Sequence, residues 1–181
     1  MGRESYNFLL APKDYEIIFD DGIVELKGNQ ALPFSEVVKN LSSIPLVQSY
    51  IAKESSKDKN AECYYFYSDS VCIIELEVNS GIIEDKGVEE ISVRFAVINP
   101  VDTFHKTIQI CKGICNKLQM QMIDLRLGQV LDLSDDLQIL RSKKAFETKR
   151  SDFFKLFMLD EETWTKPSHC GKDLYDLIRS R

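Results

Sequence analysis

The sequence of 181 residues contains only two histidines, His105 and His169. The sequence also lacks GxGxxG, P-loop, HExxH and GxSxG motifs. These absences exclude the enzyme classes that those motifs define. They also argue against any chemistry that needs several imidazoles as bases or metal ligands.

Long hydrophobic runs are missing as well, since no stretch approaches the ~18 residues that cross a bilayer. The first residues, MGRESYNFLL, lack the pattern of a secretory signal. The five cysteines are an odd number and form no CxxC pair, whereas disulfide frameworks usually have an even count. We therefore expect a cytoplasmic protein with reduced thiols and no membrane association.

Three segments have the features of β-structure. Residues 71–78 and 91–98 alternate apolar and polar side chains, which predicts neighbouring strands with one covered face. In the segment EIIFDDGIVELKG, two β-rich runs flank Asp21-Gly22, a dipeptide typical of a type I′ hairpin turn. Residues 6–11 and 119–127 are further predicted strands.

Helical patterns cover the rest. We expect a short helix between Pro33 and Pro45, and a longer one over 100–118 with Asn99 as its N-cap. A strand, this helix and a strand in succession predict a right-handed crossover. Residues 128–181 are predicted to be helical, with Ser134 and Ser151 as caps.

These elements predict one α+β domain over 1–181: a mainly antiparallel sheet of four or more strands covered by helices, with a helical C-terminal third. The sheet-rich core is expected over 1–127 and the helical element over 128–181.

Two neighbourhoods bring cysteine and histidine together. On the helix predicted for 100–118, Cys111 and Cys115 share a stripe with apolar residues, while His105 lies about 100° away. Core packing is the favoured interpretation, because a zinc site needs three or four convergent ligands. At His169 and Cys170 adjacent side chains seldom face each other, so we expect a capping loop. No metal or cofactor is predicted.

Charged residues give the candidate binding sites. The loop acids Glu84, Asp85, Glu89 and Glu90 and the pair Asp135 and Asp136 are predicted to contact a partner. The net charge of −6 and pI of about 5.0 favour a basic protein partner and argue against nucleic acid, despite a basic run at 141–150. Self-association stays open.

Two interpretations of other segments also stay open. Glu75, Glu77 and Arg94 form either a cross-strand ion pair or an arginine that binds an anion. The apolar side chains between Phe153 and Trp164 either dock on the sheet or form a partner surface.

In its general profile of a small, acidic, cytosolic α+β protein, the chain resembles the immunity proteins with which bacteria neutralise polymorphic toxins. The resemblance covers the whole chain but includes no signature motif. It implies a non-catalytic protein that binds and occludes a macromolecular partner, such as a basic toxin domain. The alternative is a small enzyme with a site built from scattered carboxylates, Arg94 and His105.

Overall fold

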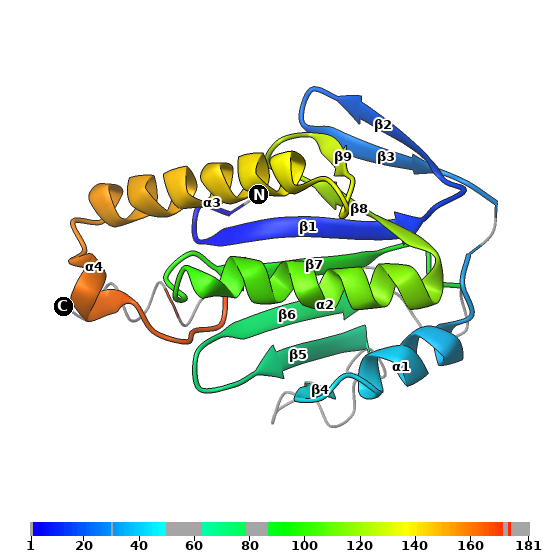
Figure 1. The fold of residues 1–181 in the computed structure, drawn as a ribbon, viewed down its shortest axis with the longest axis horizontal. Helices are drawn as coiled ribbons and strands as arrows, with labels where there is room; N and C mark the ends of the chain where they lie inside the picture. Colours follow the sequence, from blue (N-terminus) through cyan, green and yellow to red (C-terminus); the bar gives the residue numbers. More distant parts are fainter. Residues whose placement is uncertain (1, 30, 50–62, 79–86, 172–173, 175–181) are drawn as a thin grey trace.

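The computed structural model describes residues 2–29, 31–49, 63–78, 87–171 and 174, and its centre is a seven-stranded antiparallel sheet (Figure 1). The strand order is β4-β5-β6-β7-β1-β8-β9, and β2 and β3 form a separate hairpin. The strands are β1 (Ser5–Pro12), β2 (Glu16–Asp20), β3 (Ile23–Lys27), β4 (Val47–Ser49), β5 (Tyr64–Ser68), β6 (Ile73–Val78), β7 (Ile91–Ala96), β8 (Met120–Asp124) and β9 (Gln129–Leu131). The predicted α+β class is confirmed.

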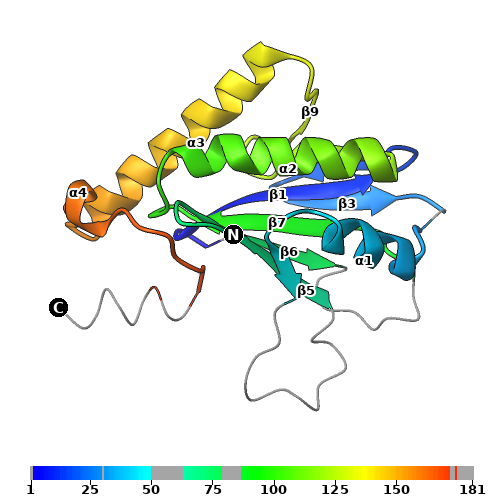
Figure 2. The same cartoon turned by 60° about the horizontal axis from the view of Figure 1, so that its bottom comes forward.

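The helices are α1 (Phe34–Ser42), α2 (Asp102–Leu118), α3 (Asp136–Leu156) and α4 (Glu161–Trp164). Figures 1 and 2 show α1, α2 and α3 on the same face of the sheet, with α2 running across its middle. None of the described helices is both long enough and apolar enough to cross a membrane.

The central strands confirm the periodicity argument. In β6, Ile74, Leu76 and Val78 are buried beneath the helices, and β6 pairs with β7 as predicted. The connection from β7 through α2 to β8 passes over β1, which pairs with both strands. Figure 1 shows that this crossover is right-handed, as predicted.

The hairpin β2–β3 covers part of the opposite face of the sheet. Its turn has positive φ angles at Asp21 (41°) and Gly22 (84°), as a type I′ turn requires. Its inward side chains contact the face formed by β1 and β8; they are Ile17, Val24 and Leu26, packed on Leu9, Ala11 and Ile123. The predicted hairpin is confirmed.

Helix α3 shares the main core with the sheet. Phe146 is fully buried, and its ring stacks on that of Phe104 from α2 with the centroids 5.8 Å apart. Further along, Phe153 and Phe154 pack with Leu159 against the end of β7. The apolar segment that follows Ser151 therefore docks largely on the sheet, although Met158 points outward.

A buried carboxylate also attaches α3 to the sheet. Asp124 has no exposed surface, and its Oδ2 accepts hydrogen bonds from the Tyr6 hydroxyl (2.7 Å) and the Ser142 hydroxyl (2.5 Å). Its Oδ1 accepts from the backbone N–H groups of Arg126 (2.8 Å) and Leu127 (3.0 Å). Four donors thus satisfy one carboxylate, which connects β1, β8 and α3.

Three cap predictions are wrong. Helix α2 begins at Asp102, and the Asn99 side chain instead bonds the backbone of Ser168 in the C-terminal segment and that of Ile73. The cap of α3 is Asp135 rather than Ser134, and Ser151 lies inside this single long helix. Of the final helix expected over 171–180, only Gly171 and Leu174 lie within the described residues.

Candidate functional site

The predicted acidic residues that the structure describes lie in two separate places. Glu84 and Asp85 fall outside the described residues, Glu89 and Glu90 immediately precede β7, and Asp135 and Asp136 begin α3. Strands β1 and β8 separate the start of β7 from β9, which leads into α3. At ~4.8 Å a strand, this separation is about 15 Å, so the acids do not form one cluster.

Of the pair at α3, Asp135 is committed to the helix terminus. It accepts from the backbone N–H of Leu137 (2.9 Å) and of Gln138 (3.3 Å), which satisfies donors that the first turn leaves open. Asp136 is exposed on the first turn. Asp136 can therefore bind a partner protein while Asp135 continues to cap α3.

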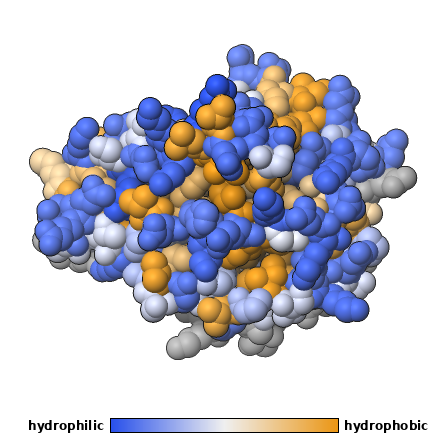
Figure 3. All heavy atoms as spheres, viewed as in Figure 1, coloured by the Kyte–Doolittle hydropathy of each residue, from blue (hydrophilic) through white to orange (hydrophobic). Residues whose placement is uncertain are grey.

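Apolar side chains are exposed at the same end of the molecule. We call this area the β9 surface; its apolar members are Phe19, Leu127, Val130, Leu137 and Leu140, and its carboxylates are Asp20, Asp132 and Asp136. Figure 3 shows apolar atoms gathered over the β2–β3 hairpin and near the start of α3.

Two contacts join the parts of the β9 surface, which lie on both faces of the sheet around its edge strand β9. The Phe19 ring lies 3.8 Å from where a Cβ would stand on Gly128, in the turn between β8 and β9. Val130 pairs with Ile123 and therefore lies on the sheet face that the hairpin covers. The Asp132 backbone N–H donates to the Gln138 side chain (3.0 Å), which joins the end of β9 to α3.

The sequence interpretation missed these apolar residues, although α3 carries a signal for them. At 100° a residue, Leu137 lies about 180° from Phe146 and Leu140 about 120° from it. A helix buried through Phe146 must therefore leave both leucines outside, and they are 66% and 58% exposed.

Another group of polar side chains lies on the sheet face opposite α2. We call it the Glu75 cluster; its members are Glu75, Arg94, His169 and Cys170. Phe66, Glu75 and Arg94 are neighbours on β5, β6 and β7, and Glu75 Oε2 accepts from Arg94 Nε at 2.6 Å. Its Oε1 accepts from His169 Nδ1 (2.9 Å) and from the Cys170 backbone N–H (3.0 Å). The cross-strand ion pair between Glu75 and Arg94 is thus present. The other oxygen of Glu75 holds the C-terminal segment on the sheet through His169 and Cys170.

The Glu75 cluster is poorly suited to catalysis. Three donors surround the Glu75 carboxylate, and burial together with the Glu75 charge raises the pKa of the Cys170 thiol far above its usual value. A nucleophilic cysteine needs the reverse shift. His105 lies on α2, its Nε2 3.0 Å from the Gln109 amide, so the sheet separates it from Arg94.

The cysteines on α2 pack in the core as predicted. Cys111 and Cys115 are buried free thiols, and burial raises both pKa values, that of Cys115 to about 12. Across the part of the chain that the structure describes, no group of three His, Cys, Asp or Glu side chains is placed to hold a metal ion.

The Glu75 cluster predicts a pH dependence of stability. Burial alone would raise the pKa of Glu75, but the His169 hydrogen bond and the Arg94 charge outweigh it and lower the pKa below 4.5. Stability from a carboxyl with a lowered pKa is fully present above the unfolded value and is lost as the pH falls through the folded value. Glu75→Gln should therefore cost about 1–2 kcal/mol at pH 6, and this cost should shrink toward pH 3.

Urea titrations of wild type and Glu75→Gln at pH 6, 4.5 and 3 measure this difference. Glu77→Gln, on the same face of β6, is the matched control, since Glu77 forms no ion pair among the described residues. A difference that stays constant over this range would contradict the assignment.

Comparison of this chain with protein-family models, curated proteins and solved structures finds no match in any of the three.

Proposed function

We propose that this protein is a non-catalytic cytoplasmic interaction protein that binds a basic protein partner through the β9 surface and occludes it. This is the mode of action of the immunity proteins that the chain resembles in profile. The partner would be a toxin-like protein whose active site or active conformation is blocked.

The observation that carries this proposal is the coincidence of exposed apolar side chains with carboxylates at one end of the molecule. Leu137 and Leu140 project from the first turns of α3, beside the exposed Asp136. Large apolar side chains supply most of the affinity of an interface, while charge complementarity mainly speeds encounter. Arg126, Arg141 and Lys112 also border the surface, so the exposed leucines rather than an excess of acidic groups carry the proposal.

The leucines offer a direct test. Leu137→Ser/Leu140→Ser should weaken binding of the partner by about 100-fold, since each buried anchor is worth roughly 1–2 kcal/mol. Both positions are exposed, so the fold should persist. The partner is first recovered by pull-down and mass spectrometry, and purified partner is then titrated by calorimetry.

Leu156→Ser is the matched control, because Leu156 lies on the same helix and is 51% exposed. It should leave affinity unchanged, and the wild-type association rate should fall with added salt. Equal affinities for the double variant and wild type would refute the role of the β9 surface. Recovery of no protein partner, together with a small molecule that raises the melting temperature, would favour the enzyme alternative.

A further inference from the structure

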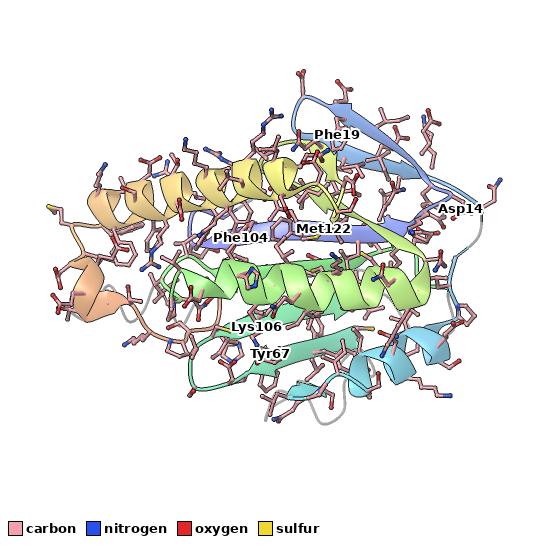
Figure 4. The ribbon with its side chains drawn as sticks, in the orientation of Figure 1. Asp14, Phe19, Tyr67, Phe104, Lys106 and Met122 are labelled. Atoms are coloured by element: carbon pink, nitrogen blue, oxygen red, sulfur yellow. The ribbon has the colours of Figure 1, made fainter. Side chains whose placement is uncertain are left out.

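A hollow of about 320 Å³ lies between the end of α1 and the exposed side of α2. Its lining comes from α1 and the turn after it, from β5 and from α2: Asn40, Ile44, Pro45, Leu46, Tyr67, Lys106, Gln109, Ile110, Gly113 and Lys117. Figure 4 labels Lys106 and Tyr67, which lie side by side on one border of this region.

The hollow is locally basic although the protein is acidic. Lys106 and Lys117 both line it, and no carboxylate occurs in the sequence from 103 to 123 or from 37 to 49. Among the described residues neither ammonium group forms an ion pair. The nearby Asp69 is already bound by the Tyr67 hydroxyl (2.6 Å) and by backbone N–H groups. An anionic group is therefore the complementary occupant.

Gly113 keeps the hollow open. It stands in the interior of α2, where glycine weakens a helix relative to alanine. A Cβ added there would meet no heavy atom within 4 Å, so a side chain at this position would project into open space. Helix stability does not explain this glycine, whereas space for a ligand does.

The Asn40 side chain marks the polar end of the hollow. Its Oδ1 is buried and has no hydrogen-bond partner among the described residues. Because this oxygen has almost no exposed surface, the group at this end of the hollow that can meet an anion is the Lys117 ammonium. Lys117 lies close by, since its Nζ is 3.4 Å from the Ser43 hydroxyl, and that hydroxyl donates to the Asn40 carbonyl at 2.7 Å.

We infer that this hollow binds a small aliphatic carboxylate. The carboxylate group lies at Lys117, and the hydrocarbon part packs on Ile44, Leu46 and Ile110. The same chemistry occurs in a free fatty acid of medium length and at the C-terminus of a peptide that ends in an apolar residue. The hollow is near the β4 edge of the sheet and the β9 surface is at the opposite edge, so the two proposals stand or fall separately.

Titration of the ¹⁵N-labelled protein with octanoate, followed by amide NMR shifts, tests the inference. The shifts of Gly113 and Lys117 should change in a saturable manner. Octanol, which has no charge, and inorganic phosphate, which has no apolar part, should each bind at least tenfold more weakly. An acetylated dipeptide with a C-terminal leucine, free or amidated, distinguishes the two sources, because only the free acid should bind.

Variants locate the site. Lys117→Met should weaken octanoate binding about tenfold, and Gly113→Leu should abolish it by filling the hollow. Lys112→Met is the control, since Lys112 lies on α2 outside the hollow and donates to the Leu133 carbonyl. Saturable shifts that persist in Gly113→Leu, equal binding of octanol and octanoate, or no shift with octanoate would each overturn the inference.

Discussion

Replacement of Asp124 by alanine is expected to lower the free energy of unfolding by about 3–5 kcal/mol. The carboxylate is fully buried and accepts from two hydroxyl groups and two backbone N–H groups. Its removal leaves several of these donors buried without a partner, at about 1–3 kcal/mol each. The Tyr6 hydroxyl is affected least, because it also lies 3.2 Å from the Ser142 carbonyl oxygen.

Urea unfolding followed by circular dichroism measures this loss. Tyr6→Phe is the comparison: it removes a single donor and should cost about 1 kcal/mol. Burial and the Asp124 charge raise the pKa of Tyr6, so its hydroxyl keeps its proton and remains a donor at every ordinary pH. If Asp124→Ala were no less stable than Tyr6→Phe, the carboxylate would not be what holds α3 to the sheet.

The second large effect is expected at Arg150, a buried arginine on α3. Its Nη1 donates to the carbonyl oxygens of Val97 and Asn99, the latter at 2.6 Å, and its Nη2 donates to the Thr165 hydroxyl at 2.5 Å. Its guanidinium carbon is 4.7 Å from the centroid of the Phe154 ring. Arg150→Met keeps the apolar stem but leaves both carbonyls unsatisfied, and should cost about 3–5 kcal/mol.

The loss at Arg150 should appear first in the segment after α3. Hydrogen exchange at pH 7 should show that amides near Thr165 and Lys166 lose protection before those of β1 and β7. Glu161→Gln is the control: Glu161 pairs with Arg150 at 3.0 Å but is largely exposed, so its loss should cost less than about 1 kcal/mol. Uniform loss of protection across the sheet in Arg150→Met would contradict a local role.

The predictable part of the fold depended on local periodicity. Strands β6 and β7 alternate burial with a period of two, and the stripe on α2 follows the helical period, so both could be read from neighbouring residues. The turn at Asp21-Gly22 was likewise specified by its own backbone requirements. The structure of these elements is therefore determined by residues that are close together in the sequence.

The polar tethers could not be found in this way. Arg150 belongs to the basic run at 141–150, yet its partners lie on the β7–α2 connection and beyond α4. Asn99 has the residue type of a cap but bonds across the molecule to Ser168. In each case the decisive partner is distant in sequence, and a residue's type does not identify it.

The candidate site was anticipated only in part. Asp136 and its neighbour were selected by charge, while the apolar members of the β9 surface depend on which side of α3 faces the core. That orientation follows from Phe146, whose burial beside Phe104 depends on tertiary packing between α3 and α2.

The position of β1 has a consequence for how the chain acquires its structure. This strand is wholly buried, and its two neighbours begin only at Ile91 and Met120. During synthesis β1 therefore remains unpaired until both partners are made, with backbone N–H and C=O groups open along each edge and its apolar side chains uncovered. Pairings between such distant segments form slowly, and open edges invite association with other chains. The nascent protein should accordingly depend on chaperones until β8 emerges from the ribosome, whereas β5, β6 and β7 can pair as a local meander before then.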